Sequence, residues 1–331
     1  MTTSKRHHLK QWAACGLVAA TALLASGQAL ASTKLKWAHV YETSEPYHTE
    51  SVWAAEEIKK RTNGKFEIQV FPASTLGKET DINQGMQLGT VDMIISGPSF
   101  AARSYPRLGI AYYPFIFRDG DHLLAYSKSD VFQEMTNEFR KKTGIQITAY
   151  TYYGARHTTS QKVFKNCEGM KGLKIRVPDV PAYRATPEAC GANPTPIAFA
   201  EVYLALQNGT VEAQENPLTT IEAKKFFEVQ KAIMLTGHIV DGLTTQIAPH
   251  VWSKLSDAEK KIFTDVTREA AARASAKIKE REAMLAGEFR KRGLQVVEVD
   301  RESFRKAVLS KVPLKSMGFS QSDYDRIQAA K

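Results

Sequence analysis

Apolar residues follow two different spacings along the first half of the chain. In the segment 66–70, apolar residues at every second position indicate a strand with one buried face. In the segment 47–61, Val52, Ala55 and Ile58 recur at the spacing of an amphipathic helix. Such patterns predict strands at 34–40, 66–70, 91–96 and 145–152, and helices at 47–61, 79–88 and 121–141. This order is typical of an α/β fold with parallel strands.

The second half of the chain begins a similar unit. The segment 173–177 alternates apolar and basic residues and predicts a strand. We expect helices at 181–190 and 199–207 and another strand from Val211. Leu-Gly-Thr-Val-Asp at 88–92 resembles Asn-Gly-Thr-Val-Glu at 208–212, and both follow a predicted helix and enter a predicted strand. Chance can produce so short a match, but a unit used twice is what two similar α/β lobes would contain.

A long helix is expected near the C-terminus. A capping box at 256–259 opens a segment of helix-forming residues without proline, and Gly293 ends it. A helix over 257–292 is about 50 Å long at the α-helical rise. Since this exceeds an ordinary domain helix, it is either kinked near Gly287 or spans two lobes. A last strand at 294–299 and a polar helical tail follow.

The N-terminus has the features of a secretory signal peptide. Basic residues precede an apolar run over 12–24, and a small-residue cleavage site lies at 29–31. We therefore expect residues 1–31 to be removed and the mature chain to be periplasmic. No later stretch is long and apolar enough to cross a membrane.

Two cysteines, Cys167 and Cys190, remain in the mature chain. A single pair in an oxidising compartment can form a disulfide, but the sequence leaves their separation open. Two cysteines without clustered histidines make a poor metal site, so we expect no metal.

Charge and motifs argue for a binding protein. The signal peptide holds three basic and no acidic residues, so 42 basic and 35 acidic residues remain, a net charge of +7. This excess favours anionic ligands, but no basic cluster interleaved with aromatic residues predicts nucleic-acid binding. Phosphate-loop, dinucleotide-binding, zinc-protease and serine-hydrolase motifs are absent, and each histidine of the mature chain is isolated in sequence. We expect neither enzymatic activity nor a cofactor.

Three polar stretches are candidates for a ligand site. Arg156 precedes hydroxyl side chains at 158–160, Arg176 lies near the end of a predicted strand, and Gln-Glu-Asn-Pro occupies 214–217. Guanidinium, amide and hydroxyl groups at strand ends suit the carboxylate and hydroxyls of a small polar molecule. For Arg176, an internal ion pair explains the pattern equally well at this point. The 214–217 stretch is also a common turn sequence.

Four ordered blocks of sequence resemble the substrate-binding proteins of tripartite ATP-independent periplasmic (TRAP) transporters, in the dicarboxylate-binding DctP family. The blocks lie at 153–160, 170–178, 194–207 and 213–217, and the resemblance covers essentially the whole mature chain. It implies an α/β, two-lobed periplasmic-binding-protein (Venus-flytrap) fold with a long helix spanning both lobes. We expect lobe I to comprise 32–153 and about 242–281, and lobe II to comprise 154–241 and about 282–331.

The resemblance also implies roles for individual residues. By position, Arg176 matches the arginine that clamps the ligand carboxylate, Arg156 a second arginine, and Asn216 the asparagine beside them. Sialic-acid binders place an aromatic residue at the position of Phe199 and an acidic hydroxyl acceptor at that of Glu79. With the resemblance, the clamp is favoured over the internal ion pair for Arg176.

The chain departs from the sialic-acid binders at two positions. Where they carry an Asn and a Glu, this chain has Val40 and Gly97. Losing both contacts disfavours sialic acid, because its polar groups would be left unpaired. We therefore expect a hexuronate such as glucuronate or galacturonate, with sialic acid and a C4-dicarboxylate as alternatives. His39, with Glu42 or His48, is a candidate partner of the ring hydroxyls because of its place at a strand exit.

The implied function is that of a solute receptor. It would close on its ligand by hinge motion and deliver it to separate TRAP membrane permease subunits. A secreted enzyme on the same fold would consume the sugar acid, whereas a receptor returns it unchanged. A sensor module would differ from the receptor only in its partner.

Overall fold

The computed structural model describes residues 32–331, and the predicted signal peptide lies outside the described residues. In the described part of the chain the strands form one nine-stranded sheet, in the order β2-β1-β3-β8-β4-β7-β5-β6 with β9 beside β8. The strands are β1 (Thr33–Ala38), β2 (Phe66–Phe71), β3 (Met93–Ser96), β4 (Gln146–Ser160), β5 (Lys174–Val177), β6 (Asn193–Pro196), β7 (Ala213–Pro217), β8 (Ala232–Ile247) and β9 (Gln295–Val297).

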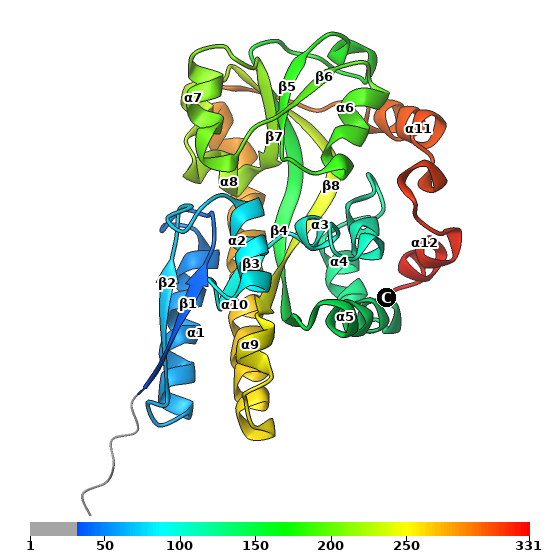
Figure 1. The fold of residues 1–331 in the computed structure, drawn as a ribbon. Coiled ribbons are helices and arrows are strands. Elements are labelled where there is room, and N and C mark those ends of the chain that lie inside the picture. The colour runs from blue at the N-terminus through cyan, green and yellow to red at the C-terminus, as the bar shows by residue number, and fades with distance from the viewer. Residues whose placement is uncertain (1–31) are drawn as a thin grey trace, which may run out of the picture.

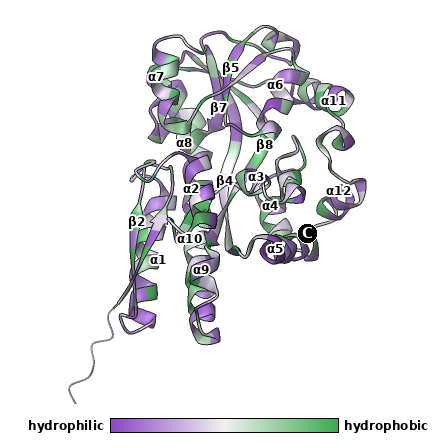
Figure 2. Ribbon diagram, in the orientation of Figure 1, coloured by the Kyte–Doolittle hydropathy of each residue, from purple (hydrophilic) through white to green (hydrophobic). Residues whose placement is uncertain are grey.

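Helices cover this sheet. They are α1 (Pro46–Arg61), α2 (Glu79–Leu88), α3 (Pro98–Ala101), α4 (Gly120–Tyr126), α5 (Asp130–Thr143), α6 (Ala185–Ala189), α7 (Val202–Gln207), α8 (Leu218–Ala223), α9 (Pro249–Trp252), α10 (Asp257–Lys291), α11 (Arg301–Lys311) and α12 (Gln321–Gln328). The outer helices α5 and α12 are mainly hydrophilic (Figure 2). Among these helices, none has both the length and the apolar composition that a bilayer crossing requires.

Two long antiparallel strands, β4 and β8, join two lobes (Figure 1). In lobe I, β1 pairs in parallel with β2 and β3. In lobe II, β5 pairs in parallel with β6 and β7. The β4–β8 ladder is irregular where it crosses between them, with a register shift between Tyr152 and Gly154. The two-lobed α/β fold is thereby confirmed, although the strands that connect the lobes are antiparallel.

The short repeat noticed in the sequence is also a repeat in three dimensions. Gly89 and Gly209 each adopt a left-handed conformation after a helix, with φ of 76° and 73°. Asp92 then accepts a hydrogen bond from the backbone N–H of Lys36 on β1. Glu212 accepts the corresponding bond from Lys174 on β5. Each lobe therefore uses the same helix–turn–strand unit to place a strand beside its first one.

The long helix is confirmed and spans both lobes. Helix α10 has 35 residues, begins with a capping box formed by Ser256 and Glu259, and continues through Gly287. Its first half buries Phe263 in the core of lobe I, and its second half buries Phe289 in a separate core of lobe II. The two lobes therefore share one rigid element.

Three other expectations differ from the structure. The helix expected at 121–141 is two helices, because Ser129 caps a new helix start. The strand expected to end at residue 152 continues to Ser160, so β4 enters lobe II. Strand β8 was not predicted, since its residues are almost all buried and show no alternation.

The C-terminal tail also departs from the expected lobe boundaries. Helix α12 packs against lobe I, where Asp323 pairs with Arg107 at 2.6 Å. The backbone carbonyl of Ile327 lies 2.8 Å from Nε2 of His122. The chain thus returns from α11 in lobe II to lobe I, because its buried partners lie there, and the remaining boundaries stay a prediction.

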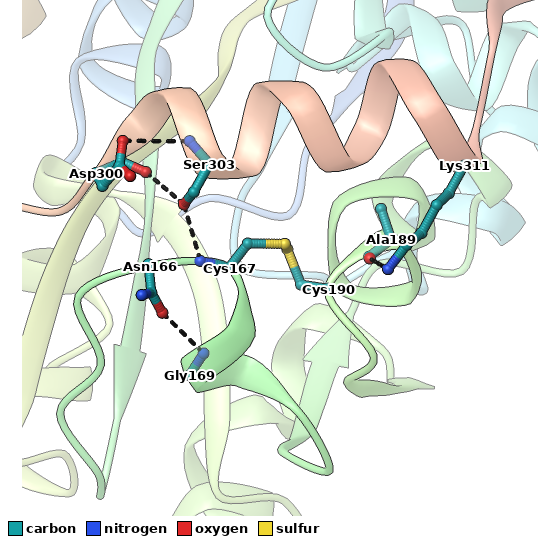
Figure 3. Close-up of a disulfide and its surroundings, with 8 residues drawn as sticks. All are labelled: Asn166, Cys167, Gly169, Ala189, Cys190, Asp300, Ser303 and Lys311. Atoms are coloured by element: carbon teal, nitrogen blue, oxygen red, sulfur yellow. Dashed lines mark hydrogen bonds between the residues drawn. A yellow bond between two sulfur atoms is a disulfide. The ribbon is translucent and has the colours of Figure 1, made fainter.

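A disulfide joins Cys167 and Cys190 within lobe II (Figure 3). It closes the segment that carries β5 and α6. Helix α11 covers it, with Ser303 Oγ accepting from the N–H of Cys167 at 3.0 Å and Lys311 Nζ donating to the carbonyl of Ala189 at 2.6 Å. The disulfide and helix α11 together hold the segment that contains β5 in place.

Candidate functional site

A small cavity lies between the two lobes. Lobe I contributes Tyr41, Glu79 and Phe100, and lobe II contributes Arg176 and Asn216 among others. Its volume is about 30 Å³. A wider groove of about 360 Å³ adjoins it and shares Glu79, Phe100 and Arg176 in its wall. Such a polar cavity at the junction of two α/β lobes is a typical place for a small ligand.

The sheet order brings the polar residues together. Arg176 lies on β5, Asn216 on β7, Arg156 on β4 and Asp241 on β8, and these are four successive strands of the sheet. All four side chains are buried and line the cavity. Residues that are far apart in sequence therefore form a continuous row of polar groups.

Arg176 is buried without a counterion. Its Nε donates to the carbonyl of Ile197 at 2.9 Å, and its guanidinium lies 6.0 Å from the centre of the Phe199 ring. Among residues 32–331 no carboxylate forms an ion pair with it, although Glu215 and Glu79 are close enough to favour its charged form. Burial lowers the pKa of Arg176 to about 10, but a guanidinium keeps its proton at neutral pH. An anion entering the cavity would supply the missing partner.

Arg156 differs sharply from Arg176, because two carboxylates neutralise it. Its Nε and Nη2 lie 2.5 and 2.8 Å from the carboxylate oxygens of Glu215. Its Nη1 lies 2.9 Å from Oδ2 of Asp241. Nη2 also donates to Oδ1 of Asn216 at 3.1 Å. Arg156 therefore organises the cavity wall and orients Asn216.

A chain of amide and hydroxyl groups fixes Asn216 from behind. Its Nδ2 donates to Oε1 of Gln214 at 2.6 Å, and Nε2 of Gln214 donates to Oγ1 of Thr159 at 3.0 Å. Thr159 in turn donates to Oε1 of Gln230 at 2.9 Å. Because each buried group has a partner, this network holds the amide in one orientation.

Glu79 reaches the cavity from the start of α2. One oxygen, Oε1, accepts from Ser96 Oγ at 2.9 Å and from the N–H of Gly97 at 3.3 Å. Removal from water raises the pKa of Glu79 to about 7. Near neutral pH this carboxyl group can therefore accept or donate a hydrogen bond.

Three residues expected near the ligand do not line the cavity. Nε2 of His39 lies 3.2 Å from Nδ1 of His48, and burial, with the nearby His48, lowers the pKa of His39 to about 3. Glu42 pairs with Lys224 of lobe II at 2.6 Å. A role for these three residues in ligand binding stays a prediction that the geometry does not favour.

The positions that depart from sialic-acid binders, Val40 and Gly97, do line the cavity. A Cβ atom at Gly97 would lie 2.7 Å from the hydroxyl of Tyr112. A glutamate at this position would therefore displace Tyr112, and the cavity is built around the absence of a side chain there.

The sequence analysis missed several cavity residues. Asp241, Tyr183, Tyr153 and Tyr41 all line it. The aspartate had a signal, because it is a charged residue in a short, otherwise apolar stretch, Ile-Val-Asp-Gly-Leu. The tyrosines had none, since aromatic residues are equally common in cores. Among the described residues, no group of histidine, cysteine and acidic side chains is arranged to hold a metal ion.

Comparison with known proteins agrees with this geometry. Residues 37–314 match the family model of bacterial extracellular solute-binding proteins, family 7 (DctP). The chain is 32% identical over 291 residues to the sialic acid-binding periplasmic protein of Vibrio cholerae. The matched region covers 88% of this chain and 91% of that protein. A TRAP periplasmic solute-binding protein from a Polaromonas species, bound to D-erythronate, has a TM-score of 0.86 and 33% identity over 91% of this chain and 99% of that one. A Roseobacter denitrificans homologue with bound L-galactonate has a TM-score of 0.83 and 31% identity, over 90% and 98% of the two chains. The chain belongs to the DctP family of TRAP transporter solute-binding proteins.

Proposed function

We propose that this protein is a periplasmic receptor that binds a carboxylated sugar between its lobes and delivers it to a TRAP membrane permease. The observation that carries the proposal is the buried guanidinium of Arg176 with no counterion among the described residues. A ligand carboxylate satisfies it bidentately. Asn216, held by Arg156, adds an amide beside the carboxylate.

Ligand binding is coupled to closure of the lobes. Two ion pairs cross between them, Glu42 with Lys224 at 2.6 Å and Arg103 with Asp179 at 2.8 Å. The first pair is partly buried and the second is exposed. A buried hydrogen bond from Thr220 to Glu45 at 3.0 Å and the ring contact of Tyr112 with Tyr183 also cross between the lobes. The ligand adds to the free energy that favours the closed state, since it contacts both lobes only when they are closed.

The ligand is a hydroxylated acid, and it must extend beyond the inner cavity. Relatives bind sialic acid, D-erythronate and L-galactonate, which share a carboxylate and several hydroxyls. The inner cavity of about 30 Å³ has room for about two water molecules. Even a four-carbon aldonate is larger than this, so every candidate acid, the predicted hexuronate included, would also occupy the adjoining groove. Sialic acid would in addition lack partners at Val40 and Gly97.

A thermal-shift panel tests the proposal. Ligand-free protein is mixed with D-erythronate, L-galactonate, D-glucuronate, D-galacturonate, sialic acid, succinate and a neutral hexose. A ligand that binds only the folded state raises the unfolding midpoint by mass action. We expect a shift with one or more of the sugar acids and none with the hexose. No shift with any acid would refute the proposed ligand class.

The variant Arg176→Ala separates the clamp from the fold. We expect it to remain folded and to lose binding of the acid that shifts the wild type. Unchanged affinity would refute the clamp. Recovery of the ligand unchanged after incubation with the wild type distinguishes a receptor from an enzyme.

A further inference from the structure

Asp241 offers an unused acceptor inside the cavity. Its side chain is buried on β8 and lines the cavity wall. Oδ2 accepts from Nη1 of Arg156 at 2.9 Å, whereas the buried Oδ1 has no hydrogen-bond partner among the described residues. A buried carboxylate oxygen without a donor is costly. The hydroxyl of Tyr112 lies close to this carboxylate but donates to the backbone carbonyl of Gly242 at 2.8 Å. The ion pair with Arg156 holds the Asp241 side chain in place.

Asp241 lies three strands away from the clamp, in the wall of the same cavity. Arg176 lies on β5 and Asp241 on β8, with β7 and β4 between them. Three inter-strand steps separate the strand axes by about 14 Å, which long side chains and a small ligand can bridge. A ligand held by its carboxylate at Arg176 can therefore extend towards Asp241.

A second acidic group stands on the lobe I side. Glu79 lines the same cavity, and Oε1 already accepts two hydrogen bonds, from Ser96 and Gly97. Acidic side chains thus stand beside the hydroxyls of Tyr41, Tyr153 and Tyr183 in the cavity wall. A ligand hydroxyl can donate to Asp241, whereas a carboxylate at that point can only accept and would be repelled by the Asp241 carboxylate.

We propose that Asp241 makes the site selective for monocarboxylic acids that carry hydroxyl groups, and that it excludes dicarboxylates. This inference rests on the proposed function and narrows its ligand class. Asp241 accepts a hydrogen bond from a ligand hydroxyl through Oδ1 while Oδ2 stays with Arg156. The orphaned oxygen becomes satisfied only when a hydroxylated ligand is bound.

The test compares matched acids. Ligand-free wild-type protein is titrated calorimetrically with D-erythronate and D-glucuronate, and with succinate and adipate, the dicarboxylates of equal carbon number. We expect at least one hydroxylated acid to bind about a hundredfold more tightly than its matched dicarboxylate, because buried acceptors left unpaired penalise the wrong ligand. The inference would be overturned if the dissociation constant of the dicarboxylate were within about threefold of that of its matched hydroxylated acid.

The variant Asp241→Asn tests the residue itself. Its amide oxygen can keep the hydrogen bond from Arg156, so its NH₂ group would face the cavity and replace an acceptor by a donor. We expect the preference for the hydroxylated acid over the dicarboxylate to fall at least about tenfold. The matched control Asp265→Asn makes the same charge change on the exposed face of α10, where Asp265 pairs with Lys261, and should leave both affinities unchanged.

The outcomes separate the two proposals. Tight binding of a hydroxylated acid with an unchanged preference in folded Asp241→Asn overturns the inference and leaves the receptor standing. Binding of dicarboxylates alone also overturns it. Failure of every acid to bind the wild type overturns the proposed function as well. If Asp241→Asn does not fold, the wild-type comparison still decides, since it needs no variant.

Discussion

Replacing Arg176 by methionine should leave the ligand-free protein at least as stable as the wild type, although we expect it to abolish ligand binding. The reason is that this guanidinium is buried without a counterion among the described residues. Methionine has a similar length and can fill the space without carrying a charge. A group kept for its ligand is expected to be a burden on the empty protein.

The magnitude follows from the environment of Arg176. Burial lowers its pKa from an ordinary 12.5 to about 10, which corresponds to about 3 kcal/mol of unfavourable free energy for the charged form. The variant loses the hydrogen bond to Ile197, worth about 1 kcal/mol, and the contact with Phe199, worth about 0.5–1 kcal/mol. We therefore expect a net gain of about 1 kcal/mol in the free energy of unfolding.

Arg156 provides the matched control. It lies in the same cavity wall and is equally buried, but Glu215 and Asp241 neutralise it. Arg156→Met would leave two buried carboxylates without their cation, and His238 near Glu215 can replace only part of that interaction. We expect a loss of about 3–5 kcal/mol. The same substitution at these two arginines is thus expected to change the free energy of unfolding in opposite directions.

The assay is equilibrium unfolding in urea, after co-purified ligand has been removed by partial unfolding and dialysis. Fluorescence and far-UV circular dichroism are recorded together, because two lobes can unfold in separate steps. A loss of more than about 1 kcal/mol in Arg176→Met would refute the reasoning, since it would mean that Arg176 has a stabilising partner. An Arg156→Met variant as stable as the wild type would also refute the reasoning, because it would mean that Glu215 and Asp241 do not need this cation.

Two further predictions concern stability. The double variant Cys167→Ser/Cys190→Ser opens a loop with a sequence separation of 23 residues and should lower the free energy of unfolding by about 3 kcal/mol; a loss below about 1 kcal/mol would contradict this. For Glu79, burial raises the pKa from 4.5 to about 7, so the folded state keeps a proton that the unfolded state releases between these pH values. That contribution favours folding at low pH and is lost as the pH rises through 7. Relative to the wild type, Glu79→Gln should therefore gain about 2 kcal/mol of stability between pH 5 and pH 8 in urea unfolding, and parallel pH profiles would count against it.

Local sequence patterns determined most of the elements of this protein. Strand periodicity predicted β1, β2 and β5, and a capping box with a distant glycine stop predicted α10 almost to the residue. These features depend on neighbours a few positions away, so they are visible without the fold. Resemblance to a family then singled out Arg176, Asn216, Phe199 and Glu79, all of which line the cavity.

Tertiary structure alone decided which arginine is ion-paired. The resemblance named Arg176 as the clamp and Arg156 as a second arginine, and the sheet then pairs Arg156 with Glu215 and Asp241 and leaves Arg176 without an ion pair among the described residues. It also made β8 a strand, where complete burial removes the alternation that marks a half-exposed strand. Whether a buried charge is paired depends on residues up to 85 positions away. No local sequence pattern predicts the sheet order that brings these residues together. Which arginine is free to take a ligand is therefore a property of the folded molecule.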